Sequence, residues 1–110
     1  MFKKLVLENR SYRGYDESRK ITREELLEMV DCARLTPASI NMQPLKYYLA
    51  YTDECVAKIR PLTKWARALP ELKLPHPGHG PTAFIIICQD TDLQPSITRF
   101  QKDIGIAAQT

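Results

Sequence analysis

A continuous apolar run near the C-terminal end of the chain, Phe84-Ile85-Ile86-Ile87-Cys88, constrains the fold more than any other feature. Three of its five residues are β-branched, which favours a β-strand. A strand without polar residues has no face suited to water, so the run predicts a sheet with helices on both faces. It is also far shorter than the roughly 20 apolar residues that a membrane-spanning helix needs. We therefore expect an α+β domain.

Helical patterns occupy much of the remaining chain. Thr22-Arg23-Glu24-Glu25 has the pattern of a capping box, in which the threonine hydroxyl and the last glutamate each satisfy a backbone amide of the other. The helix that it begins should end near Leu35, because Pro37 disfavours a helical conformation of the residue before it. The other expected elements are a helix over 2–9, a loop over 10–20, a strand over 46–51, a helix over 53–60 with a further turn or two over 62–69, a loop over 70–81, and a final helix that starts at Pro95.

Composition narrows the class of protein. With 110 residues, 44% of them hydrophobic, the chain can bury one modest core and is expected to form one domain. The net charge of +3 is spread among acidic residues, which argues against a nucleic-acid surface. The three cysteines match no metal or redox spacing, and the N-terminus lacks the pattern of a secretory signal. We expect a soluble protein of the reducing cytoplasm, with no nucleic-acid or membrane partner.

The first group of candidate functional residues is Asn9-Arg10-Ser11-Tyr12-Arg13, at the junction of a helix and a loop. Two guanidinium groups and a hydroxyl are suited to a phosphate, because the planar fork of arginine donates to two oxygens at once. The alternative is a solvated basic loop with Asp16 and Glu17 as neighbours. Short patterns of this kind match by chance often, so this motif does not decide between the two.

The second group lies in Pro37-Ala38-Ser39-Ile40-Asn41-Met42-Gln43-Pro44, between a helix and a strand and bracketed by prolines. Ser39, Asn41 and Gln43 alternate, so along an extended backbone their side chains would line one side. Amide side chains both donate and accept, which suits the edge of a heterocycle. The alternative is a turn in which Ser39 and Asn41 satisfy their own backbone.

Taken together, these patterns resemble the flavin mononucleotide (FMN)-dependent nitroreductase family. The resemblance rests on the order of four elements: Arg-Ser-x-Arg, the capped helix, the Pro-Ala-Ser-x-Asn-x-Gln-Pro segment, and an apolar strand followed by Asp103-Ile104-Gly105-Ile106-Ala107-Ala108-Gln109. It covers nearly the whole chain. It implies a nitroreductase-like α+β sheet flanked by helices, with residues 1–110 forming a partial FMN-binding domain.

The resemblance also implies a function and a site. Members of the family transfer a hydride from NAD(P)H to FMN and then to nitroaromatics, quinones or related acceptors, and they bind the flavin at a homodimer interface. Arg10, Ser11 and Arg13 would contact the phosphate, ribityl chain and pyrimidine end. The ring would be approached from the other protomer by Pro37, Ala38, Ser39, Asn41 and Gln43. No acid–base residue is required, because the protein positions and tunes the cofactor.

Two departures from the family pattern concern single residues. Ala38 stands where many relatives have serine, which removes a hydroxyl, and Leu45 replaces an aromatic residue. The chain also ends at Thr110, inside the predicted central helix, which indicates a truncated domain that would aggregate or oligomerise. The alternative function is therefore a non-catalytic remnant that dimerises without flavin; a small basic binding module for a nucleotide or nucleic acid is a third.

Other residues carry weaker signals. His76 and His79 are too few ligands for zinc, so we expect a loop pair without metal. Trp65 is expected on a helix, packed into the core. Cys32 and Cys88 fall in apolar segments and are expected to be unreactive.

Overall fold

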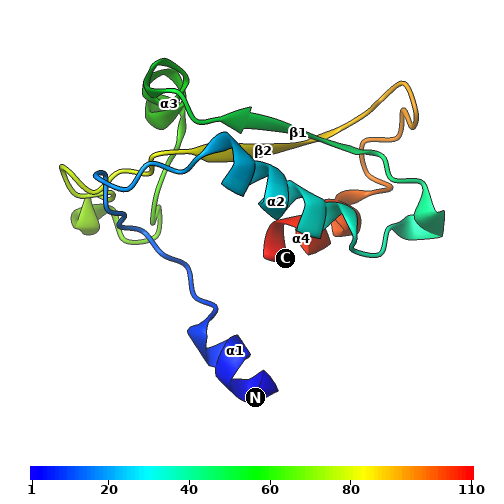
Figure 1. Ribbon diagram of the computed structural model, residues 1–110, viewed down its shortest axis with the longest axis horizontal. Coiled ribbons are helices and arrows are strands. Elements are labelled where there is room, and N and C mark those ends of the chain that lie inside the picture. The colour runs from blue at the N-terminus through cyan, green and yellow to red at the C-terminus, as the bar shows by residue number, and fades with distance from the viewer.

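Two antiparallel strands form the sheet of this protein, whose computed structural model describes residues 1–110 (Figure 1). Strands β1 (Leu45–Ala50) and β2 (Phe84–Gln89) pair with Leu45 opposite Gln89 and Ala50 opposite Phe84. The helices are α1 (Phe2–Glu8), α2 (Arg23–Arg34), α3 (Asp53–Ile59) and α4 (Gln101–Gln109), with 3-10 turns η1 (Ser39–Asn41), η2 (Arg60–Leu62) and η3 (Pro70–Leu72). This mixture of helices and strands confirms the α+β class.

The predicted capping box is present at the start of α2. The Thr22 hydroxyl accepts from the amide of Glu25 at 3.2 Å, and the Glu25 carboxylate accepts from the amide of Thr22 at 2.8 Å. The Arg19 guanidinium also forms a bidentate ion pair with the Glu25 carboxylate. The helix ends at Arg34 with Leu35 as its C-cap, as predicted.

The helices lie on both sides of the sheet but cover it unequally. Both α2 and α4 pack on one side and against each other, and α3 lies by one end of the other side (Figure 1). On the α2 side, Tyr47 and Ile87 line an apolar cavity of about 400 Å³ that reaches Ala107 of α4. On the α3 side, Tyr48 and Ile86 stay 54% and 41% exposed. The apolar run therefore has a covered face and a half-open one.

Two segments differ from their sequence predictions. The last helix begins at Gln101 and not at Pro95, because the Gln89 side chain donates to the carbonyls of Gln94 and Ser96, both at 2.8 Å, and holds that segment as a loop. No helix forms over 63–69. Trp65 is half-buried in that loop, where its indole N–H donates to the Thr63 hydroxyl at 2.8 Å.

The core is small for the length of the chain. Its buried hydrophobic side chains are few and include Leu26, Val56 and Phe100. The accessible surface is 8638 Å², whereas a compact monomer of this mass exposes roughly 6,200 Å². The radius of gyration is 15.7 Å, against roughly 13 Å for a compact domain of this length. Much apolar surface of this chain is therefore available for contact with other protein.

Helix α1 and the residues that follow it form an arm that projects from the rest of the chain (Figure 1). Phe2, Leu5 and Val6 on this helix are between 53% and 80% exposed. None of the helices has the length and apolar character that crossing a membrane requires.

Candidate functional site

The arm carries the first group of candidate residues. Helix α1 ends at Glu8, and its C-cap Asn9 adopts an extended backbone. Arg10, Ser11 and Arg13 follow as exposed residues. Neither guanidinium group forms an ion pair; Arg13 donates only to the carbonyl of Ser11, at 3.4 Å. Two arginines without carboxylate partners remain available for an anion.

The acidic neighbours of this group are engaged elsewhere. Asp16 accepts from the Ser18 hydroxyl at 2.6 Å and from its amide at 2.9 Å, and these bonds hold the pKa of Asp16 below its usual value. Glu17 accepts from the amide of Gly80 at 2.8 Å and lies 3.4 Å from the Arg60 guanidinium. Asp16 and Glu17 therefore do not pair with Arg10 or Arg13, which both stay exposed.

The base of the arm is anchored to the loop before β2. The amide of Tyr15 donates to the carbonyl of His79 at 3.0 Å, and the Thr82 hydroxyl donates to the carbonyl of Arg19 at 3.0 Å. A side chain at Gly80 would meet atoms of Arg60 and Glu17 at 2.9 Å, so glycine permits this close approach. The arm thus projects from a fixed point, and Arg10 and Arg13 lie beyond it.

The second group forms a tight turn and not the extended path that we expected. Residues Ser39–Asn41 make a 3-10 turn, and Ile40, Asn41 and Gln43 have φ near +50°. This left-handed conformation costs an L-residue roughly 1–2 kcal/mol, and it is least expected of a β-branched residue such as Ile40. Backbone strain of this kind is common at ligand-binding sites. The Gln43 amide donates to the Asn41 side-chain oxygen at 3.3 Å, so the two amides lie together.

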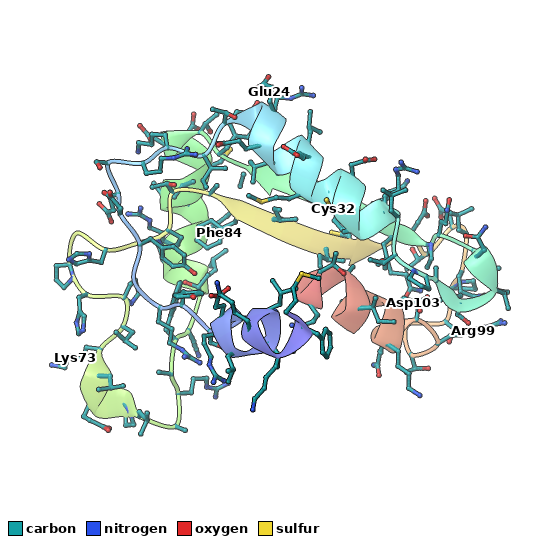
Figure 2. The ribbon with its side chains drawn as sticks, turned by 60° about the horizontal axis from the view of Figure 1, so that its bottom comes forward. Glu24, Cys32, Lys73, Phe84, Arg99 and Asp103 are labelled. Atoms are coloured by element: carbon teal, nitrogen blue, oxygen red, sulfur yellow. The ribbon has the colours of Figure 1, made fainter.

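A buried carboxylate contacts this turn from α4. Asp103 is 7% exposed, and its two oxygens lie 3.1 and 3.3 Å from the backbone nitrogen of Ser39 (Figure 2). With Pro37, Ala38 and Gln43, Asp103 lines a pocket of about 50 Å³. Such a volume holds one or two water molecules and cannot contain a flavin ring. A flavin would have to lie outside this pocket, against the exposed surface of the turn.

The two groups do not meet within one chain. In Figure 1 the arm projects below the rest of the chain, whereas the Ser39–Asn41 turn lies at the right, and no hydrogen bond or ion pair joins them. None of the cavities that Pro37, Ala38 or Gln43 line includes Arg10, Ser11 or Arg13. In this structure the two groups therefore do not form one site within a chain.

Sequence reasoning gave Asp103 no role, although the residue opens the Asp-x-Gly segment. The available signal was a carboxylate in the first turn of α4, and its partner, 64 residues away, is not visible in any local pattern. No group of three or more His, Cys, Asp or Glu side chains is placed to hold a metal ion.

Comparison with known proteins decides the family. The model of the nitroreductase family matches residues 6–110, which include both candidate groups and the Asp-x-Gly helix. The chain belongs to the nitroreductase family. The resemblance inferred from the four ordered motifs is thereby confirmed.

Two relatives within the nitroreductase family show how much of a full-length member the chain represents. YdgI of Bacillus subtilis (strain 168), which carries the name NAD(P)H nitroreductase, is 33% identical over 64 residues, 58% of this chain and 31% of YdgI. A nitroreductase of Exiguobacterium sibiricum 255-15, solved in complex with FMN, has a TM-score of 0.64 and 29% identity over 84% of this chain and 40% of its own. The chain spans between three and four tenths of the length of these relatives.

Proposed function

We propose that residues 1–110 are the FMN-binding part of an oxidoreductase that transfers hydride from NAD(P)H to nitroaromatic, quinone or similar acceptors. Membership of the nitroreductase family and the FMN complex of the Exiguobacterium sibiricum relative support this reading. The proposal includes a homodimer in the cytoplasm, and it agrees with three cysteines that form no disulfide.

The observation that carries the proposal is the pair of arginines without acidic partners on the arm. Arg10 and Arg13 fit the FMN phosphate because they offer planar, permanently charged donors that no carboxylate of the chain occupies. Ser11 adds a hydroxyl next to them. Arg10 and Arg13 have no evident structural role, since neither forms an ion pair with another element of the chain.

The turn of the second group would supply the contacts to the flavin ring. Asn41 and Gln43 offer amide donors and acceptors for the polar edge of the ring, and the Pro37–Ser39 backbone would lie beside them. Because the turn and the arm are separated within one chain, a complete site would combine the arm of one protomer with the turn of its partner. When bound, FMN supplies the redox chemistry, and the residues of the chain bind and orient it.

The experiment is a flavin titration of the purified chain, followed by absorbance and fluorescence, with the mass in solution measured alongside. We expect a protein-bound spectrum at one FMN per chain in a dimer, and oxidation of NADH or NADPH when a quinone is added. A dimer without flavin at millimolar FMN would support the alternative, a non-catalytic remnant. Salt-sensitive binding of nucleic acid without flavin binding would support the basic binding module.

A further inference from the structure

The Asp103 carboxylate is the least expected charged group in the molecule. It is 7% exposed, yet no lysine or arginine pairs with it, and its hydrogen-bond donor is the single backbone amide of Ser39. Burial of a charge without a cation is unfavourable, so such groups are retained where their charge or geometry is needed. Asp103 occupies the first turn of α4 but forms no side-chain cap of its own helix. Both carboxylate oxygens of Asp103 instead lie near the backbone amide of Ser39 in the turn.

The amide that Asp103 holds lies at the start of the strained backbone. Ser39 directly precedes Ile40 and Asn41, both left-handed, and the turn closes through bonds from Asn41 to Ala38 at 3.0 Å and from Met42 to Ser39 at 3.2 Å. The turn has no other side-chain contact to its backbone from a distant element. Asp103 therefore connects α4 to a turn whose left-handed backbone the residues of the turn do not favour.

We infer that Asp103 is a positioning residue: through the Ser39 amide it fixes the Ala38–Gln43 turn in the conformation in which Asn41 and Gln43 meet the flavin. This inference rests on the proposed function for the identity of the ligand. The contact itself does not depend on the proposed function, because the Asp103 carboxylate accepts from the Ser39 amide in the structure of the chain alone.

The test compares the full chain with its Asp103→Ala and Asp103→Asn variants. Amide hydrogen exchange is measured by NMR at Ser39 and, as an internal reference, at Leu26 in α2. In Asp103→Ala we expect exchange at Ser39 to be at least about 10-fold faster and FMN affinity to fall by about 10-fold, with Leu26 unchanged. Asp103→Asn keeps an acceptor oxygen and should recover part of both losses. Asp92→Ala, which removes an exposed acid from the preceding loop, should change neither.

The outcomes separate the inference from the proposed function. If Ser39 exchange is unaffected in both Asp103 variants, or if exchange accelerates while FMN affinity stays at the wild-type value, Asp103 does not position the turn for the flavin. If the wild-type chain binds no FMN, the proposed function fails for this chain; the Ser39 readout then still decides whether Asp103 fixes the turn. Should Asp103→Ala fail to fold, Asp103→Leu, which also removes both acceptor oxygens but fills the buried volume, provides the same comparison.

Discussion

In the candidate site, exposed side chains are found next to a strained backbone. Arg10 and Arg13 are free of acidic partners, whereas Ile40 is held with φ of +50° although its side chain is 70% exposed. Sequence patterns located all these residues, because each belongs to a short motif of distinctive residue types. They could not show the left-handed backbone, since isoleucine disfavours it and the contact from Asp103 that accompanies it comes from 64 residues away.

Replacement of Ile40 by glycine should stabilise the chain. Glycine adopts positive φ without steric penalty, and little burial is lost because the side chain is exposed. After subtraction of the extra unfolded-state entropy of glycine, we expect a gain of about 0.5–1 kcal/mol in the free energy of unfolding, measured by urea denaturation. Ile40→Ala retains the penalty at positive φ and should show no such gain. An Ile40→Gly variant less stable than Ile40→Ala would contradict the strain argument.

Substitution of Arg13 by lysine should weaken FMN binding while leaving riboflavin binding unchanged. Lysine keeps the charge but loses the planar fork, and the loss of one charge-assisted hydrogen bond corresponds to roughly a 10-fold weaker Kd. Isothermal titration with the two flavins separates the phosphate contribution from the ring contribution. Arg23→Lys in the first turn of α2 is the matched control. Equal losses for FMN and riboflavin would place Arg13 away from the phosphate.

At the level of elements, local signals predicted α1, α2, α3 and both strands closely. The capping box set the start of α2, and the strands follow from runs of aromatic and β-branched residues. The start of α4 was wrong because two bonds from the Gln89 side chain determine it, and these depend on how β2 lies beside the following loop. An element with its own cap is predictable, whereas the start of α4 depends on side-chain bonds within the preceding loop that no periodic pattern records.

The acid dependence of stability should report the Arg19–Glu25 pair. The Arg19 guanidinium, and after it the Thr22 amide, lower the pKa of Glu25 from 4.5 to about 2. A carboxyl group with a depressed folded-state pKa contributes stability above its unfolded pKa and loses that contribution as the pH falls through the folded value. We therefore expect the contribution to disappear between about pH 4.5 and pH 2.

The measurement is the Tm of the wild type and of Glu25→Gln across that pH window. Glutamine keeps an oxygen for the Thr22 amide but removes the ion pair, so the variant should lose less Tm on acidification than the wild type does. Glu24→Gln, at the neighbouring position without an ion pair, serves as control and should follow the wild type. Parallel curves for Glu25→Gln and the wild type would show that the pair does not stabilise the fold.

For the whole molecule, the decisive feature is how far the arm lies from the Ser39–Asn41 turn. The accessible surface of 8638 Å² and the small core leave much of the chain free to pack against other protein, as the proposed dimer requires. The family pattern of the sequence implied such a dimer. The amount of exposed surface was not predictable from it, because exposure depends on how the elements pack in three dimensions.

Mixing two inactive variants should restore part of the flavin binding. Arg13→Ala damages the arm and Asn41→Ala the turn; in a mixed dimer one site carries both changes and the other carries neither. After joint unfolding and refolding at equal amounts, random pairing gives about a quarter of the wild-type number of intact sites. Bound FMN per chain measures this recovery. A mixture of Arg13→Ala with Arg10→Ala should recover none, and the same result for both mixtures would mean that each site lies within one chain.

The two-stranded sheet exposes strand edges through which copies of the chain can aggregate. In a sheet of this size no strand is interior, so β1 and β2 each leave one row of backbone amides and carbonyls without a strand partner. Along β2 that row accompanies Phe84 to Cys88, which contains no charge and no proline to discourage strand addition from another molecule. Lys46, which lies opposite Cys88 in the ladder, pairs with Asp90 at 2.7 Å. These charges lie beside the Cys88 end of the row, so the part from Phe84 to Ile87 has no charged residue of its own to oppose strand addition.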